Sequence, residues 1–175
     1  TGWLVGLCSY LAMIAVLGLA MTSRFVWPGA LAAPALRQLP IVGLSAIALL
    51  AAAQLGLLAA DIRQRPLLRS LDGLDVALQT TAGVALVVRA VVAVAAGVGF
   101  IAMGRRAGER ASAAAFLAPC VVLLATWSLG GHAWSMRWPI LGVPVDVVHH
   151  AAAATWLGGL VVVGSVALRV LDGHD

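Results

Sequence analysis

The chain has 175 residues, of which 62% are hydrophobic and 10% are charged, and its mean hydropathy is +1.03. Soluble domains contain about 45 to 50% apolar and about 25% charged residues, so this composition excludes an ordinary soluble fold and indicates an integral membrane protein. The net charge of +4 comes from eleven arginines and seven acids. Because the arginines gather at the ends of apolar runs, they indicate membrane topology, and we expect no nucleic-acid partner.

Apolar runs long enough to cross a bilayer core of about 30 Å recur along the chain. The predicted spans cover about 3–22, 41–60, 74–103, 111–129 and 145–170. Pro40 and Pro144 are expected to open the second and fifth spans, since a proline at the first helical position loses no hydrogen bond. We therefore predict an all-α bundle of about five spans that forms a single transmembrane domain over residues 1–175. Such a bundle is expected to be part of a larger one, in a longer protein.

The arginines divide unequally between the two ends of the predicted bundle. One end collects Arg24, Arg37, Arg105, Arg106, Arg110 and Arg169. The other end collects Arg63, Arg65, Arg69 and Arg137. Because cytoplasmic loops carry the excess of positive charge, the first end is predicted to be cytoplasmic and the loop 130–143 to lie on the outer face.

Three of the four histidines lie close together in the sequence, within 132–150. If Pro144 opens the fifth helix, Asp146 lies in its first turn, and helical steps of three and seven residues place His149 and Trp156 on the same stripe. His150 is expected to point about 100° away. His132 ends the preceding span on the same side of the membrane. A carboxylate one turn before an imidazole can orient it toward a metal, so we expect Asp146 to orient His149 and Trp156 to wall the site.

Arg89 lies within 84–100, an otherwise uncharged run. A central arginine costs about 2.5 to 3.5 kcal/mol on insertion scales, so a partner or a polar cavity is expected. Two interpretations stay open. In one, the charge lines an ion pathway or fixes Asp146; in the other, the arginine snorkels or pairs for packing.

Tryptophans and glycines near the histidines have simpler interpretations. Trp127, Trp134 and Trp138 are expected to mark the membrane boundary, where amphipathic rings are favoured. Gly158 and Gly159 are expected to allow close helix packing.

The pattern around the histidines resembles the copper resistance protein D (CopD) family. Its residues are Gly131-His132-Ala133, Asp146-x-x-His149 and Trp156-x-Gly158-Gly159. Weaker matches upstream are Tyr10-Leu11-Ala12 with Gly18, and Thr80-Thr81-Ala82-Gly83 with Arg89. The resemblance implies a multi-pass protein of the bacterial inner membrane, working beside a periplasmic, CopC-like copper-binding protein. It also implies further spans or, in some relatives, a cytochrome oxidase assembly domain. Family members generally have more than five spans, and His150 stands beside their usual single histidine.

Copper, the metal that the resemblance implies, suits these residue types. Imidazole serves both copper oxidation states, and thioethers favour Cu(I). We therefore expect His132 and His149 to bind copper, with Met136 and His150 as further candidates, in a protein of copper transport or resistance. No nucleophile and base pair is visible, so an enzyme is not expected. Two alternatives stay open: a haem b-binding electron-transfer protein using the same histidines, and a non-catalytic subunit of a larger complex such as an oxidase assembly factor.

Overall fold

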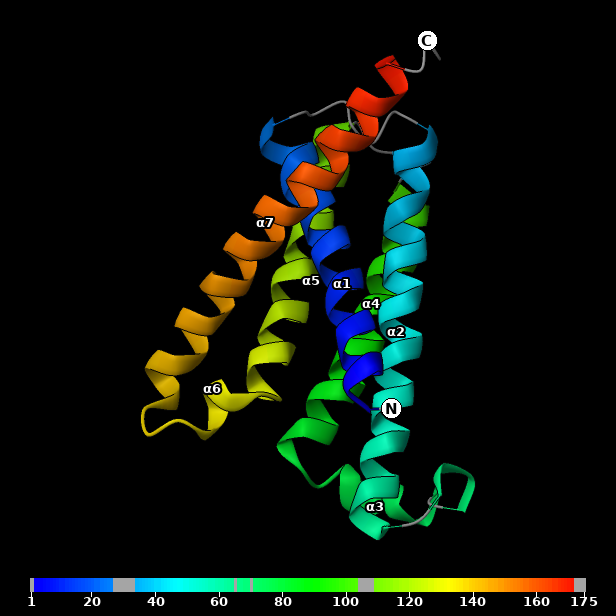
Figure 1. The fold of residues 1–175 in the computed structure, drawn as a ribbon, viewed down its shortest axis with the longest axis vertical. Coiled ribbons are helices and arrows are strands. Elements are labelled where there is room, and N and C mark those ends of the chain that lie inside the picture. Colours follow the sequence, from blue (N-terminus) through cyan, green and yellow to red (C-terminus); the bar gives the residue numbers. More distant parts are fainter. Residues whose placement is uncertain (1, 27–33, 65, 70, 104–108, 172–175) are drawn as a thin grey trace.

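The computed structural model describes residues 2–26, 34–64, 66–69, 71–103 and 109–171, and every regular element within them is helical. The long helices are α1 (Gly2–Met21), α2 (Pro34–Arg63), α4 (Thr81–Met103), α5 (Glu109–Leu129) and α7 (Pro139–Leu171). The short ones are η1 (Thr22–Val26), η3 (Leu67–Arg69), η4 (Leu71–Gly73), α3 (Leu74–Ala77) and α6 (His132–Ser135). The predicted all-α bundle is confirmed (Figure 1).

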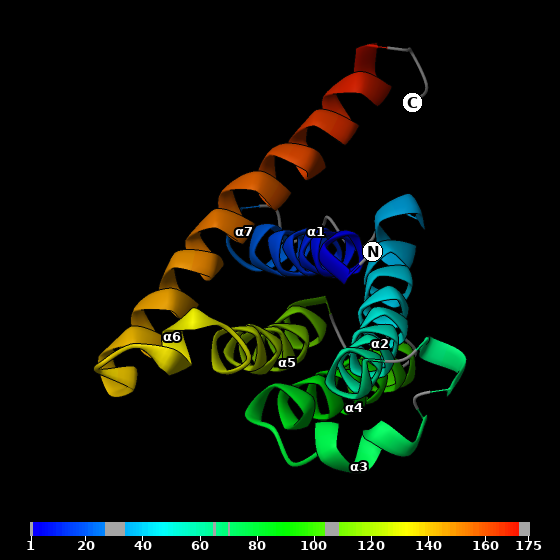
Figure 2. The ribbon, with the colours of Figure 1, turned by 60° about the horizontal axis from the view of Figure 1, so that its bottom comes forward.

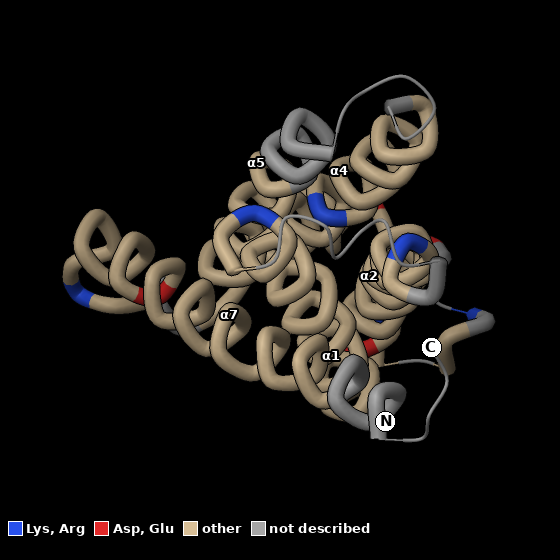
Figure 3. Tube along the Cα trace, turned by 90° about the horizontal axis from the view of Figure 1, so that it is seen from above, with Lys and Arg blue, Asp and Glu red and all other residues tan. Residues whose placement is uncertain are grey.

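Four helical segments of the described chain are long and apolar enough to cross a membrane. They are Gly2–Val26, Leu36–Arg63, Thr81–Ala102 and Pro139–Gly164. Leu117–Leu129 within α5 is a shorter apolar segment. Figure 3 shows how little of the described chain is charged. The chain is therefore a multi-pass membrane protein. Four of the five predicted spans correspond to such a segment, and the remaining one corresponds to α5, of whose side chains the structure describes 117–129.

Successive long helices run in alternating directions, so their ends meet in two groups (Figure 1). The start of α1, α4 and α7 lies at the same end as α3 and α6, which we call the α6 end. Arg63 and Arg137 belong to the α6 end, and Arg24 and Arg37 belong to the opposite one. This is the division that the sequence predicts for these four residues.

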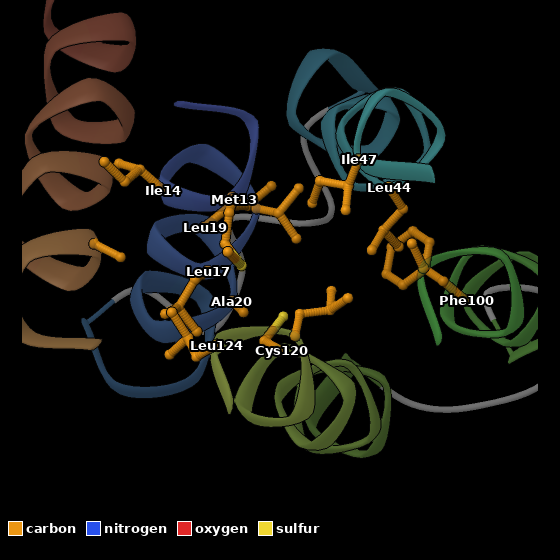
Figure 4. Packing of buried hydrophobic residues seen from close by; sticks show 14 of the residues in the cluster. Met13, Ile14, Leu17, Leu19, Ala20, Leu44, Ile47, Phe100, Cys120 and Leu124 are labelled. Carbon is orange, nitrogen blue, oxygen red and sulfur yellow. The ribbon is translucent and has the colours of Figure 1, made fainter. Parts of the chain in front are cut away.

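Helix α1 occupies the middle of the bundle, with α7 along one side and α2 and α5 on the other (Figures 2 and 4). Its face contributes the fully buried Leu17 and Leu19 to the core. Leu44 and Ile47 from α2 and Leu124 from α5 meet them there. Buried apolar packing therefore holds α1, α2 and α5 together.

Helices α1 and α7 touch through two glycines. A methyl group added to Gly18 would collide with the Cα atom of Gly158 and lie 2.8 Å from the carbonyl oxygen of Ala154. A methyl group on Gly158 would likewise collide with Gly18. Membrane helices associate by such close backbone contact because lipid supplies no hydrophobic drive between them. The predicted packing role is therefore confirmed for Gly158. A methyl group on Gly159 would meet only the Thr22 hydroxyl, at the ordinary contact distance of 3.5 Å.

The predicted third span is broken near its start. Residues 78–80 form a turn between α3 and α4. Thr80 Oγ1 accepts a hydrogen bond from the Gly83 backbone N–H at 2.9 Å and donates one to the Ala77 carbonyl oxygen at 2.7 Å. A threonine that accepts from the residue three positions later is an N-cap, which fixes the start of α4 at Thr81.

Helices α2 and α7 begin earlier than predicted, since Pro40 and Pro144 were expected to open them. Pro34 opens α2, which passes through Pro40, and Pro139 opens α7, which passes through Pro144. Membrane helices tolerate internal proline, so each helix can begin at the earlier of its two prolines. Asp146 is therefore about 10 Å inside α7 rather than in its first turn, at about 1.5 Å per residue.

We predict that Gly158→Ala lowers the free energy of unfolding by about 1 to 3 kcal/mol, because the added methyl group must separate two backbones. Gly164→Ala is the matched control on the same helix, since a methyl group there meets nothing within 4 Å. The higher helix propensity of alanine should leave the stability of this variant unchanged or raise it by up to about 1 kcal/mol. Unfolding in mixed micelles followed by circular dichroism measures both. Equal losses in the two variants would contradict the glycine contact.

Candidate functional site

Helix α7 pairs a carboxylate with an imidazole at the α6 end. The Nδ1 atom of His150 donates a hydrogen bond to the backbone carbonyl oxygen of Asp146 at 2.8 Å and lies 3.3 Å from its Oδ1 atom. Because a carbonyl oxygen only accepts, Nδ1 carries the ring proton. With Nδ1 used in this way, Nε2 is the ring nitrogen that remains for another partner.

This pairing corrects the expected partner of Asp146, which was His149. Four residues along a helix return a side chain to within about 40° of the starting direction, whereas three residues leave it about 60° away. Side chains also tilt toward the helix N-terminus, so a residue covers the turn before it. His150 consequently reaches back to Asp146, and it does not point elsewhere as predicted.

His149 and Trp156 share a stripe of α7, as predicted, but that stripe is exposed. His149 is exposed and Trp156 is 68% exposed. Trp156 therefore does not wall an enclosed site. The rings of His149 and His150 remain neighbours, with centroids 5.7 Å apart at an interplanar angle of 82°.

The other predicted ligands lie on the segment between α5 and α7. His132 opens α6, but its side chain lies outside the described residues. Met136 follows α6 with an extended backbone, and its side chain is 56% exposed. Within the part of the chain that the structure describes, no group of three or more His, Cys, Asp or Glu side chains could hold a metal ion.

A row of rings leads from His150 into the bundle. His150 packs edge-on against Tyr10 of α1, with ring centroids 5.5 Å apart. Tyr10 lies 5.3 Å from the Trp127 ring of α5, and the Arg89 guanidinium carbon of α4 lies 4.4 Å from that ring. Trp127 was expected only to mark the membrane boundary. It also packs inside the bundle, between Tyr10 and Arg89.

Arg89 is 4% exposed and binds neutral groups on two other helices. Its Nε atom donates to Thr126 Oγ1 at 3.2 Å, and its Nη2 atom donates to the Thr126 carbonyl oxygen at 3.1 Å. Its Nη1 atom donates to Gln54 Oε1 at 3.4 Å. Hydrogen bonds to a charged group contribute about 1.5 to 3 kcal/mol each, so three of them with the indole face can offset the insertion cost of about 2.5 to 3.5 kcal/mol.

A cavity of about 230 Å³ borders this arginine. Its walls are Gln54, Ala82, Leu86, Arg89, Trp127 and the glycines at 130 and 131. Both glycines are exposed at the α6 end, so the cavity reaches the surface there. Arg89 was expected to have a partner or a polar cavity, and the structure gives it both. The hydrogen-bonding partners of Arg89 include no acid among the described residues.

Three residues of this network were not predicted as site residues. Gln54 is the only amide in the apolar part of α2, and that isolation was an available signal. Tyr10 entered only as part of the weaker family match, and Thr126 gave no signal, because only the tertiary fold brings these side chains to His150 and Arg89.

The fold and this site define a polytopic α-helical membrane protein with a buried arginine network that leads to a histidine pair. Comparisons with protein-family models, with curated proteins and with solved structures find no match for this chain.

We predict that Thr126→Val destabilises the protein by about 1 to 3 kcal/mol, because the isosteric valine leaves the Arg89 Nε–H without an acceptor inside the bundle. Thr155→Val is the matched control. Its hydroxyl also donates to a carbonyl one turn earlier, that of Ala151 at 2.7 Å, but binds no charged group in the described structure. Unfolding in mixed micelles measures both variants, and an equal loss in the two would contradict a special role for Thr126.

Proposed function

We propose that this chain is the membrane domain of a bacterial copper-handling protein, which takes copper as its cargo at the α6 end. The observation that carries the proposal is the Asp146–His150 pair. The carboxylate and carbonyl of Asp146 hold the imidazole by Nδ1. An imidazole held in this way presents Nε2 to a metal, and metal-binding histidines usually have such a partner.

The donor set fits copper in its chemistry. His149 and His150 supply two neighbouring imidazoles, and Met136 supplies an exposed thioether at the same end of the bundle. Imidazole serves both copper oxidation states, and a thioether favours Cu(I). His132 is the further proposed ligand, since it opens α6 between Met136 and the end of α5.

The location and partner belong to the same proposal. The six-to-four division of the arginines that the sequence predicts supports an α6 end that faces the outside of the inner membrane. Copper delivered there would come from a periplasmic copper-binding protein, the CopC-like partner that the family resemblance implies. No enzymatic activity is proposed.

Copper binding by the purified protein in detergent tests the proposal. We expect the parent to retain copper, and a variant with His132→Gln, His149→Gln and His150→Gln to retain less than about a tenth as much. His174→Gln is the matched control, because it removes the histidine that is distant in sequence from the other three. Metal analysis after gel filtration measures retention, and equal copper in the triple variant and the parent would overturn the proposal.

The variant Asp146→Asn tests the orienting role of the carboxylate, and an absorption spectrum tests the haem alternative. Loss of a carboxylate that orients a ligand typically costs 10- to 100-fold in metal affinity, so about a tenfold loss is expected. A Soret band in the purified parent would instead favour the haem b alternative.

A further inference from the structure

Among the residues that the structure describes, no acidic side chain pairs with Arg89. All three of its protein hydrogen bonds go to neutral acceptors, two on Thr126 and one on Gln54. The described carboxylates with a nitrogen-bearing partner lie elsewhere, Asp75 beside Arg63 and Asp146 beside His150. Neutral acceptors complete the hydrogen bonds of the guanidinium but do not neutralise its positive charge. In the low-dielectric interior of a membrane protein, a buried charge strongly favours an opposite charge nearby.

The guanidinium also keeps unused donors. It carries five N–H bonds in a flat fork, and the three bonds use one hydrogen on each nitrogen. One N–H therefore remains on Nη1 and one on Nη2. An indole ring covers one face of the guanidinium, since the Arg89 Cζ atom lies 4.4 Å from the Trp127 centroid. A ligand that accepts from the two remaining N–H bonds approaches in the plane of the fork, which is the geometry that bidentate oxyanions use.

The cavity beside Arg89 supplies the space for such a ligand. Its volume of about 230 Å³ greatly exceeds the share of a single water molecule, about 30 Å³. It opens at the exposed glycines 130 and 131, so a ligand can enter from the α6 end without crossing the bilayer core.

We infer that the Arg89 cavity is a binding site for an oxyanion, a carboxylate or phosphate group held edge-on by the two remaining Nη hydrogens. The group can come from a small soluble anion or from an anionic lipid headgroup. This site is separate from the proposed copper ligands and does not depend on them. It explains why a membrane bundle keeps a buried arginine that no described acid neutralises.

Thermal unfolding of the purified protein at constant ionic strength tests the site. Formate or inorganic phosphate that replaces chloride is expected to raise the unfolding temperature saturably in phosphatidylcholine nanodiscs. Ala82→Leu should weaken that response at least tenfold, because it fills the cavity and leaves Arg89 with its three protein partners. Arg89→Gln should abolish the response. Arg137→Gln is the matched control, since Arg137 also lies beside a tryptophan, Trp138, but is exposed, and it should keep the full response.

Nanodiscs with phosphatidylglycerol distinguish the two sources of the oxyanion. If a lipid headgroup is the ligand, this lipid raises the unfolding temperature by itself and suppresses the formate response, and Ala82→Leu cancels both effects. If a soluble anion is the ligand, the formate response is unchanged. A response in Ala82→Leu equal to that of the parent, or no saturable response to formate, phosphate or phosphatidylglycerol, would overturn the inference.

Discussion

The buried guanidinium of Arg89 constrains the bundle more than any other group in the described chain. Burial of an arginine at membrane depth demands acceptors from neighbouring helices, because water cannot supply all of them there. Thr126 on α5 and Gln54 on α2 meet that demand, so α2, α4 and α5 must keep one relative register. Apolar packing alone would not fix it, since lipid tails compete with side chains on equal terms.

The same constraint extends to the histidine end through aromatic contacts. Trp127 faces both Arg89 and Tyr10, and Tyr10 faces His150. Helix α7 joins this row because the contact between Gly18 and Gly158 brings it against α1. Packed rings therefore form a continuous row of contacts between the arginine network and the imidazole on α7. The proposed copper ligand and the inferred oxyanion site lie at two ends of one contiguous set of side chains.

The sequence predicted the features that depend on composition and local spacing. Apolar length predicted the helices, and the isolation of Arg89 in an uncharged run predicted a partner or a polar cavity. Helical periodicity also placed His149 and Trp156 on one stripe, although the exposure of that stripe was not predicted. These predictions succeeded because membrane depth and helix geometry act on each segment alone.

Other features depend on competition between neighbours and could not be predicted in this way. Pro139 and Pro144 are both acceptable at the first position of a helix, and only the whole fold selects the earlier one. Both His149 and His150 lie within one turn of Asp146, and the choice between them depends on a difference of a few tens of degrees. Tyr10 meets His150 only after α1 and α7 have packed.

The most direct test of this account is a double-mutant cycle between His150→Leu and Trp127→Leu, measured by unfolding in mixed micelles. These two rings act on each other through Tyr10, so a connected network predicts a coupling of about 0.5 kcal/mol or more. Stability losses that add within about 0.3 kcal/mol would contradict the central claim that the histidine end and the buried arginine form one network.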